Sequence, residues 1–179
     1  DCAKGDFFNI DANLAVQQME TPFDDQIIEQ NRLLNNTYIG FGEVAVVSKS
    51  KQIAQDQNAI GVSKAAETER YLVKSKSSYK NESWDIVDAY KADSTKIVAL
   101  SDDELPAEMK GMSMEQRQAF VKQKTDERSA IQKEMARLET ERSKYIEAEN
   151  ARTNQPKTDD FGTAVATSMR NNAKTLGFD

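Results

Sequence analysis

The sequence contains no histidine among its 179 residues and only one cysteine, Cys2. Histidine is the commonest general base and the commonest metal ligand, so Ser-His-Asp, Cys-His and zinc-histidine sites are excluded. A lone cysteine cannot form an internal disulfide, and no neighbouring residue predicts an activated thiol at Cys2. The seven glycines are scattered and form no phosphate-binding loop. These absences predict that the chain is not an enzyme.

Proline and glycine are also scarce, with three and seven residues respectively. A sheet with many turns needs more of both, so the scarcity favours long helices. Apolar residues make up 38% and charged residues 30% of the chain, which leaves little material for a core. The composition therefore predicts a mainly helical fold.

The formal net charge is −6, and acidic and basic residues alternate along most of the chain. Binding to nucleic acid needs clustered Lys and Arg without interleaved carboxylates, so we expect no nucleic-acid partner. No apolar run approaches the roughly 18 residues of a membrane span, and the first residues lack the charged-then-apolar pattern of a signal peptide. We expect protein partners or self-association, and no small-molecule substrate.

Residues 1–42 predict a small α/β unit. Gly5–Asp11 is typical of a short strand, and such a strand is stable only beside others, which we expect upstream of Asp1. After a short helix at residues 14–19, Thr21 suits an N-cap, and Pro22 suits the first position of a helix ending near Asn36. We expect this helix to pack on a sheet. Its apolar positions are Phe23, Ile27, Ile28, Leu33 and Leu34.

Residues 43–152 predict a helical extension. Glu43–Tyr79 contains one glycine and no proline, which indicates one long, partly broken helix with a change of register near Gly61. Its apolar residues recur about seven apart, first Val46, Ile53 and Ile60, then Ala65, Leu72 and Tyr79. A compact connector should follow, with a short helix capped by Ser83, a capping box at Ser101–Glu104 and a bend at Leu105–Gly111.

A second long helix is predicted from the capping box Ser113–Gln116 to about Asn150. Lys124 and Arg142 interrupt its narrow apolar stripe, which needs a partner. We expect the Glu43–Tyr79 helix to be that partner, in a coiled-coil-like antiparallel pair. The stripe consists of Phe120, Ile131, Met135, Leu138 and Tyr145.

Residues 153–179 predict a polar linker with a stop at Pro156, then a final amphipathic helix with a C-cap at Gly177. We expect the apolar face of this helix to dock back onto the helical pair, with upstream sequence or another chain as the alternatives. It carries Phe161, Val165, Met169, Ala173 and Leu176.

Carboxylates are the remaining candidates for chemistry. Asp85 and Asp88, beside Trp84, lie three residues apart on one helix face, as an acid/base pair would require. The dipole of a capped helix already explains acidic residues in its first turn, so we assign no catalytic role to them. The same explanation applies to Asp102, Asp103 and Glu104, which lack calcium-loop spacing. Trp84 is interpreted as the packing centre of its local cluster.

The order of several segments resembles the end of a bacterial von Willebrand factor type A (VWA) domain and the helical extension that follows it in one group of these proteins. The matching segments are residues 5–11, 21–24, 34–42, 83–89, 104–113 and 127–146. The resemblance implies that residues 5–11 and 22–36 are the last strand and last helix of the domain. In some relatives this helix shifts when the ligand site changes state.

The family binds protein ligands through a divalent metal, such as Mg²⁺, held by an Asp-x-Ser-x-Ser loop that this sequence lacks. The resemblance therefore implies that the metal belongs to a missing upstream domain and that this chain holds no cofactor. It also implies an extracytoplasmic location, in the periplasm, at the cell surface or secreted. The leading hypothesis is a support or interaction segment of such a protein. The alternative is a free-standing helical protein that self-associates as a coiled coil.

Overall fold

A computed structural model describes residues 19–96, 100–101 and 103–153 of the chain. The predicted strand Gly5–Asp11, Cys2, Asp102 and the C-terminal amphipathic helix lie outside these residues. Contacts divide the chain into two units, of which Met19–Tyr145 is the one that the structure describes. Of the other unit, only the last turns of one helix are described.

The described residues are mainly helical, as the composition predicts. No strand is present among them, and their one isolated β-bridge joins Gly40 to Asp85. The elements are α1 (Asp24–Asn35), α2 (Ala45–Val62), α3 (Lys64–Ser75), α4 (Ile86–Ala92), the 3₁₀ turn η1 (Ala107–Met109) and α6 (Met114–Arg152).

Ser113 caps α6 as predicted, whereas α1 begins later than predicted: its N-cap residue is Phe23, where Thr21 was expected, and its first residue is Asp24, where Pro22 was expected. At the start of α1, the Thr21 backbone N–H and hydroxyl both donate to the Asp24 carboxylate, at 2.9 and 2.7 Å. At the start of α6, the Ser113 N–H donates to the Gln116 side chain at 2.8 Å, and Ser113 Oγ accepts from the Gln116 N–H. Both contacts satisfy backbone donors that a helix end leaves free.

The prediction of one long helix over Glu43–Tyr79 is wrong. The segment forms two helices, because Ser63 adopts an extended conformation (φ −172°, ψ 162°) between α2 and α3. Its hydroxyl accepts from the Ala66 N–H at 3.0 Å, which caps α3. Gly61 and Val62 are weak helix formers, so a cap immediately after them ends one helix and starts the next.

The cap of α4 also differs from the prediction. Asp85, and not Ser83, is the N-cap residue, and its carboxylate accepts from the Asp88 N–H at 3.0 Å. The Ser101–Glu104 contact is present, but it closes a turn and no long helix follows. The predicted bend after Leu105 is confirmed as η1, followed by Gly111 with φ +80°, a conformation that suits glycine.

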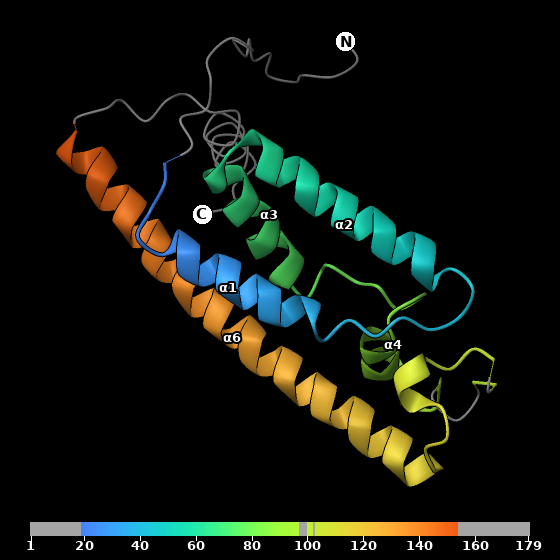
Figure 1. Cartoon of the computed structure of the whole chain (residues 1–179). Helices are drawn as coiled ribbons and strands as arrows, with labels where there is room; N and C mark the ends of the chain where they lie inside the picture. The colour runs from blue at the N-terminus through green and yellow to red at the C-terminus, as the bar shows by residue number, and fades with distance from the viewer. Residues whose placement is uncertain (1–18, 97–99, 102, 154–179) are drawn as a thin grey trace, which may run out of the picture. The chain divides into compact units, whose positions relative to one another are not determined.

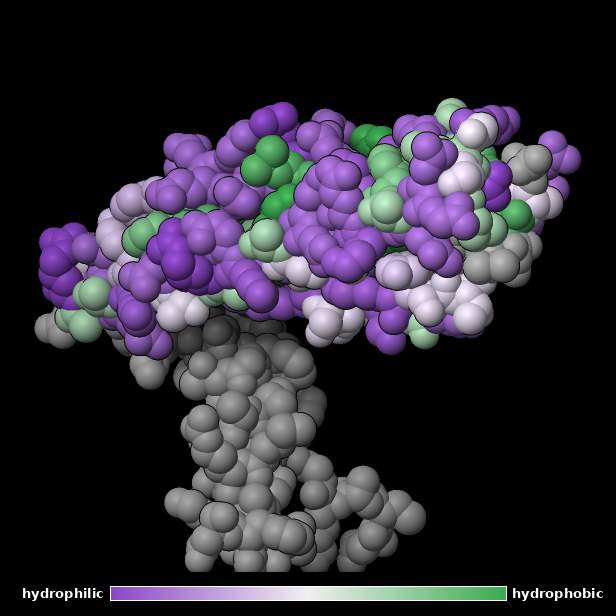
Figure 2. Space-filling model, turned by 90° about the horizontal axis from the view of Figure 1, so that it is seen from below, coloured by the Kyte–Doolittle hydropathy of each residue, from purple (hydrophilic) through white to green (hydrophobic). Residues whose placement is uncertain are grey.

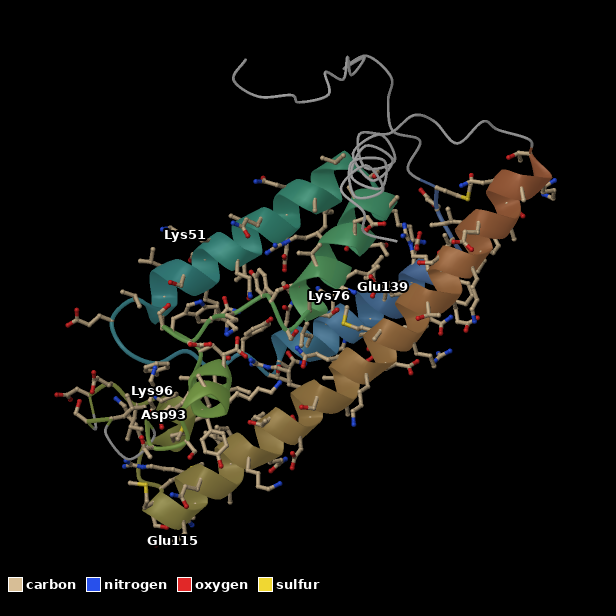
Figure 3. All side chains as sticks on the ribbon, turned by 180° about the vertical axis from the view of Figure 1, so that it is seen from behind. Lys51, Lys76, Asp93, Lys96, Glu115 and Glu139 are labelled. Carbon is tan, nitrogen blue, oxygen red and sulfur yellow. The ribbon has the colours of Figure 1, made fainter. Side chains whose placement is uncertain are left out.

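Figure 1 shows α3 between α2 and α1, with α6 alongside α1. Within Met19–Tyr145, α1 and α6 run antiparallel, since Asp24 pairs with Arg142 while Thr37, beyond the other end of α1, pairs with Arg128. The antiparallel partners of α6 are therefore α1 and α3, where a single Glu43–Tyr79 helix was expected. Lys76, the C-cap residue of α3, pairs with Glu139 of α6, and Figure 3 labels both.

The core lies between these helices in two clusters. The buried face of α1, with Ile27 and Leu34, packs against α3 and α6, where the sequence led us to expect a sheet. The first cluster contains Ile27, Leu34, Tyr38, Ala45, Tyr71, Leu72, Trp84, Met135 and Leu138. The second contains Ile39, Ile86, Val87, Leu105, Met109 and Val121. Burial of Met135 and Leu138 shows that the stripe of α6 is covered within the unit.

Leu138→Ala should lower the free energy of unfolding by about 2–5 kcal/mol, because it removes a fully buried side chain and leaves a cavity. Val73→Ala, at a half-exposed position of α3, should change it by less than about 0.5 kcal/mol. Urea unfolding of both variants measures the difference. Equal losses would show that α6 does not pack on α1 and α3 as described.

Candidate functional site

Arg128 lies at the centre of a buried junction between α6, the segment after α1 and the start of α4. Its side chain is 2% exposed, yet all three guanidinium nitrogens donate hydrogen bonds. Nη1 donates to Asp85 at 2.6 Å and to Asp88 at 2.8 Å. Nε and Nη2 donate to the hydroxyl and the carbonyl of Thr37, at 2.9 and 2.5 Å. A planar guanidinium suits such a fork of acceptors better than an ammonium would.

Asp85 is fully buried, and its carboxylate joins the same three segments. One oxygen accepts from the Ile39 N–H at 2.8 Å, and the other accepts from the Asp88 N–H. Burial raises the pKa of Asp85 above its ordinary value, and the Arg128 guanidinium opposes this shift. A buried carboxylate with four donors is held in place by its surroundings and presents no lone pair to solvent.

Aromatic rings cover the guanidinium. Its carbon lies 4.4 Å from the centre of the Tyr38 ring, in cation–π geometry. Tyr38 in turn stacks on Trp84, with 5.8 Å between ring centres, and the Trp84 indole N–H donates to Asn81 at 3.1 Å. Trp84 is buried, so its interpretation as a packing centre is confirmed.

The structure brings Asp85 and Asp88 together around Arg128, with Asp85 fully buried and Asp88 at the edge of a shallow surface pocket. This arrangement fits an ion pair that holds segments together. Glu104 accepts two hydrogen bonds from Ser101, which lower its pKa. Across the described residues, no three His, Cys, Asp or Glu side chains gather closely enough to hold a metal ion.

A second arginine of α6 repeats the pattern. Arg142 is also buried and donates to Asp24 at 3.0 Å and to Glu69 at 2.6 Å. Arg142 was predicted to interrupt the apolar stripe, and Arg128 was missed. Their signal is the spacing: Val121, Arg128, Met135 and Arg142 lie seven residues apart, which is the repeat of a helical seam.

Arg128→Ala should destabilise the fold by about 3–5 kcal/mol, because it leaves Asp85 buried without its charge partner. Arg137→Ala is the matched control on the same helix: Arg137 pairs with Glu134 at the surface, where solvent screens the pair, so its loss should change stability far less. Chemical denaturation compares the two variants. A difference below about 1 kcal/mol would contradict the role assigned to the junction.

The inward side of α2 is polar, which is unusual for a packed helix. Asp56 is 7% exposed and accepts from Lys74 at 2.5 Å and from Arg70 at 3.0 Å, both on α3. The Lys74 ammonium also donates to Asn35 at 2.7 Å. Burial lowers the pKa of Lys74, and Asp56 opposes this shift. Ion pairs therefore attach α2 to α3 where apolar side chains would be expected.

The outward side of α2 carries an apolar row. Val46, Ile53 and Ile60 are 77%, 52% and 44% exposed, so the row predicted to pair with the second long helix faces away from it. The second predicted row, on α3, does face inward, since Ala65 and Leu72 are buried. We define the outer face of α2 as Val46, Val47, Ser50, Ile53, Ala54, Gln57, Ile60 and Gly61.

The face of the molecule seen in Figure 2 differs from the outer face of α2. Hydrophilic side chains predominate on the face seen in Figure 2, where the apolar ones form small separate spots. Figure 3 shows Lys51 on the side of α2 away from α3. Isolated exposed apolar residues are normal on proteins, whereas an aligned row opposite a polar buried side is typical of an interaction surface.

No helix in the described part of the chain combines the length and apolarity that crossing a lipid bilayer requires. No protein-family model, curated protein or solved structure matches the sequence or the fold at a significant level. The candidate functional site is the outer face of α2, and it is identified from the exposure of its apolar row.

Proposed function

We propose that this chain is a non-catalytic helical support and interaction segment that binds a protein helix through the outer face of α2. The observation that carries the proposal is the inverted orientation of α2, with Gln52 and Asp56 buried and Val46, Ile53 and Ile60 exposed. Full burial of an aliphatic side chain is worth about 1.5–3 kcal/mol, so this row leaves free energy for association.

The ion pairs of Asp56 support the proposal because they explain how the orientation persists without a partner. If α2 turned its apolar row inward, the ion pair of Asp56 with Lys74 would break, and a buried charge without its partner costs several kcal/mol. The row is therefore held outward. Its spacing of seven residues matches the seam that one helix presents to another.

In the larger setting we propose, the segment follows the VWA domain of an extracytoplasmic bacterial protein, and any metal belongs to that upstream domain. The order of the matching segments in residues 5–150 supports this setting. The helices 43–152 would then act as a spacer or assembly arm. An Asp-x-Ser-x-Ser loop about 150–200 residues upstream in the coding sequence would be expected, given the usual size of a domain.

The alternative is a free-standing helical protein that self-associates. The predicted long coiled coil through α6 is not favoured, because Met135 and Leu138 of α6 are already buried against α1 and α3. Self-association through the outer face of α2 is compatible with both settings.

Photo-cross-linking tests the proposed surface in the cells that make the full-length protein. With p-benzoylphenylalanine in place of Ile53, we expect covalent adducts to a protein. The same group in place of Ala136, an exposed residue of α6, is the control and should yield none. Adducts absent at Ile53, or equally abundant at both positions, would contradict binding through α2.

A further inference from the structure

The outer face of α2 is self-complementary when the helix is set against a reversed copy of itself. With the reversal centred between Ile53 and Ala54, Ile53 faces its own counterpart and Val46 faces Ile60. On the other side of the seam, Ala54 meets its counterpart and Val47 meets Gly61. Ser50 meets Gln57 between them. Large apolar residues thus meet on one side, and on the other side the small residues Ala54 and Gly61 leave room for Val47.

We infer that the partner of this surface is a second copy of the chain, bound through two antiparallel α2 helices. This partner is the one that the proposed function requires, so the inference rests on that function. The two-fold axis passes at the level of Ile53 and Ala54. A closed two-fold interface of this kind uses the same patch twice, which is the commonest symmetry of soluble oligomers.

The small residues allow a close approach of the two helices. A Cβ atom added at Gly61 would meet nothing within 4 Å, so the space beside it is open in a single copy. Val47 of the second copy would enter this space. Ser50 and Gln57 carry a hydroxyl and an amide at the middle of the seam, where they can hydrogen-bond to each other.

Charge selects the antiparallel arrangement over the parallel one. Lys49 and Lys51 are the exposed charged residues of α2, since Asp56 is buried and paired. A parallel pair would place Lys51 of one copy beside Lys49 of the other, and the two like charges would repel. In the antiparallel pair, Lys49 lies level with Asn58 of the partner. Lys51 lies level with Asp56, which is buried against α3, and beside the neutral residues Gln55 and Gln57.

The size of the surface sets the strength of the dimer. An 18-residue helix is about 27 Å long, so the contact falls short of the roughly 800 Å² per partner of a typical stable complex. We therefore expect a dissociation constant of roughly 10 µM to 1 mM, and a monomer at low concentration.

Cysteine cross-linking tests the register. In a Cys2→Ser background, Val46→Cys and Ile60→Cys are placed on differently tagged copies of the full chain and mixed at about 1 mM, the weak end of the expected affinity. The proposed register predicts a disulfide between the two copies, because facing residues lie within reach of a disulfide. Val46–Val46 linkage would indicate a parallel pair, and no linkage beyond that of a Val62→Cys control would exclude the dimer.

Sedimentation velocity over a concentration series tests the same inference without engineered bonds. Ile53→Glu places two carboxylates together on the axis and should abolish the concentration-dependent dimer, whereas Val62→Glu, off the seam, should not. Circular dichroism checks that both exposed substitutions leave the fold intact. A chain that stays monomeric at about 1 mM overturns the inference. If Ile53 still forms adducts to a different protein in cells, the proposed function stands without it.

Discussion

The buried pair of Arg128 with Asp85 is the interaction on which the described unit depends. It joins residues 43 positions apart, and the hydrogen bonds of Arg128 to Thr37 span 91 positions. Asp85 simultaneously caps α4 and accepts from the Ile39 N–H, so one carboxylate positions three segments. Because a guanidinium requires several acceptors in a plane, this junction defines a single arrangement more sharply than aliphatic packing alone would.

Charges replace apolar residues at several places where the chain has too few of the latter. Arg128 and Arg142 alternate with Val121 and Met135 along the seam of α6. Between α2 and α3, the ion pairs of Asp56 with Arg70 and Lys74 likewise take the place of apolar contacts. Buried ion pairs add little net stability compared with apolar residues of similar size, but separating them is costly. The consequence at α2 is that the apolar side remains free for association.

Elements governed by neighbouring residues could be predicted from the sequence. The starts of α1 and α6 follow from Thr21 and Ser113, whose partners lie three residues away. Elements governed by distant partners could not. The pattern of Val46, Ile53 and Ile60 indicated a buried side, but these residues are exposed. The orientation of α2 depends on the contact of Asp56 with Lys74, and no neighbouring residue reveals that contact. Arg128 was missed for the same reason, and only its seven-residue spacing could have identified it as part of the buried seam.

Native-state hydrogen exchange of the Ile39 amide tests the central role of the junction most directly, because this amide donates to the Asp85 carboxylate. In Arg128→Lys, an ammonium cannot satisfy the same acceptors. We expect the Ile39 amide to exchange at least about tenfold faster, while the amides inside α2 change much less. Unchanged protection at Ile39, with the substitution tolerated, would contradict the central role of the junction.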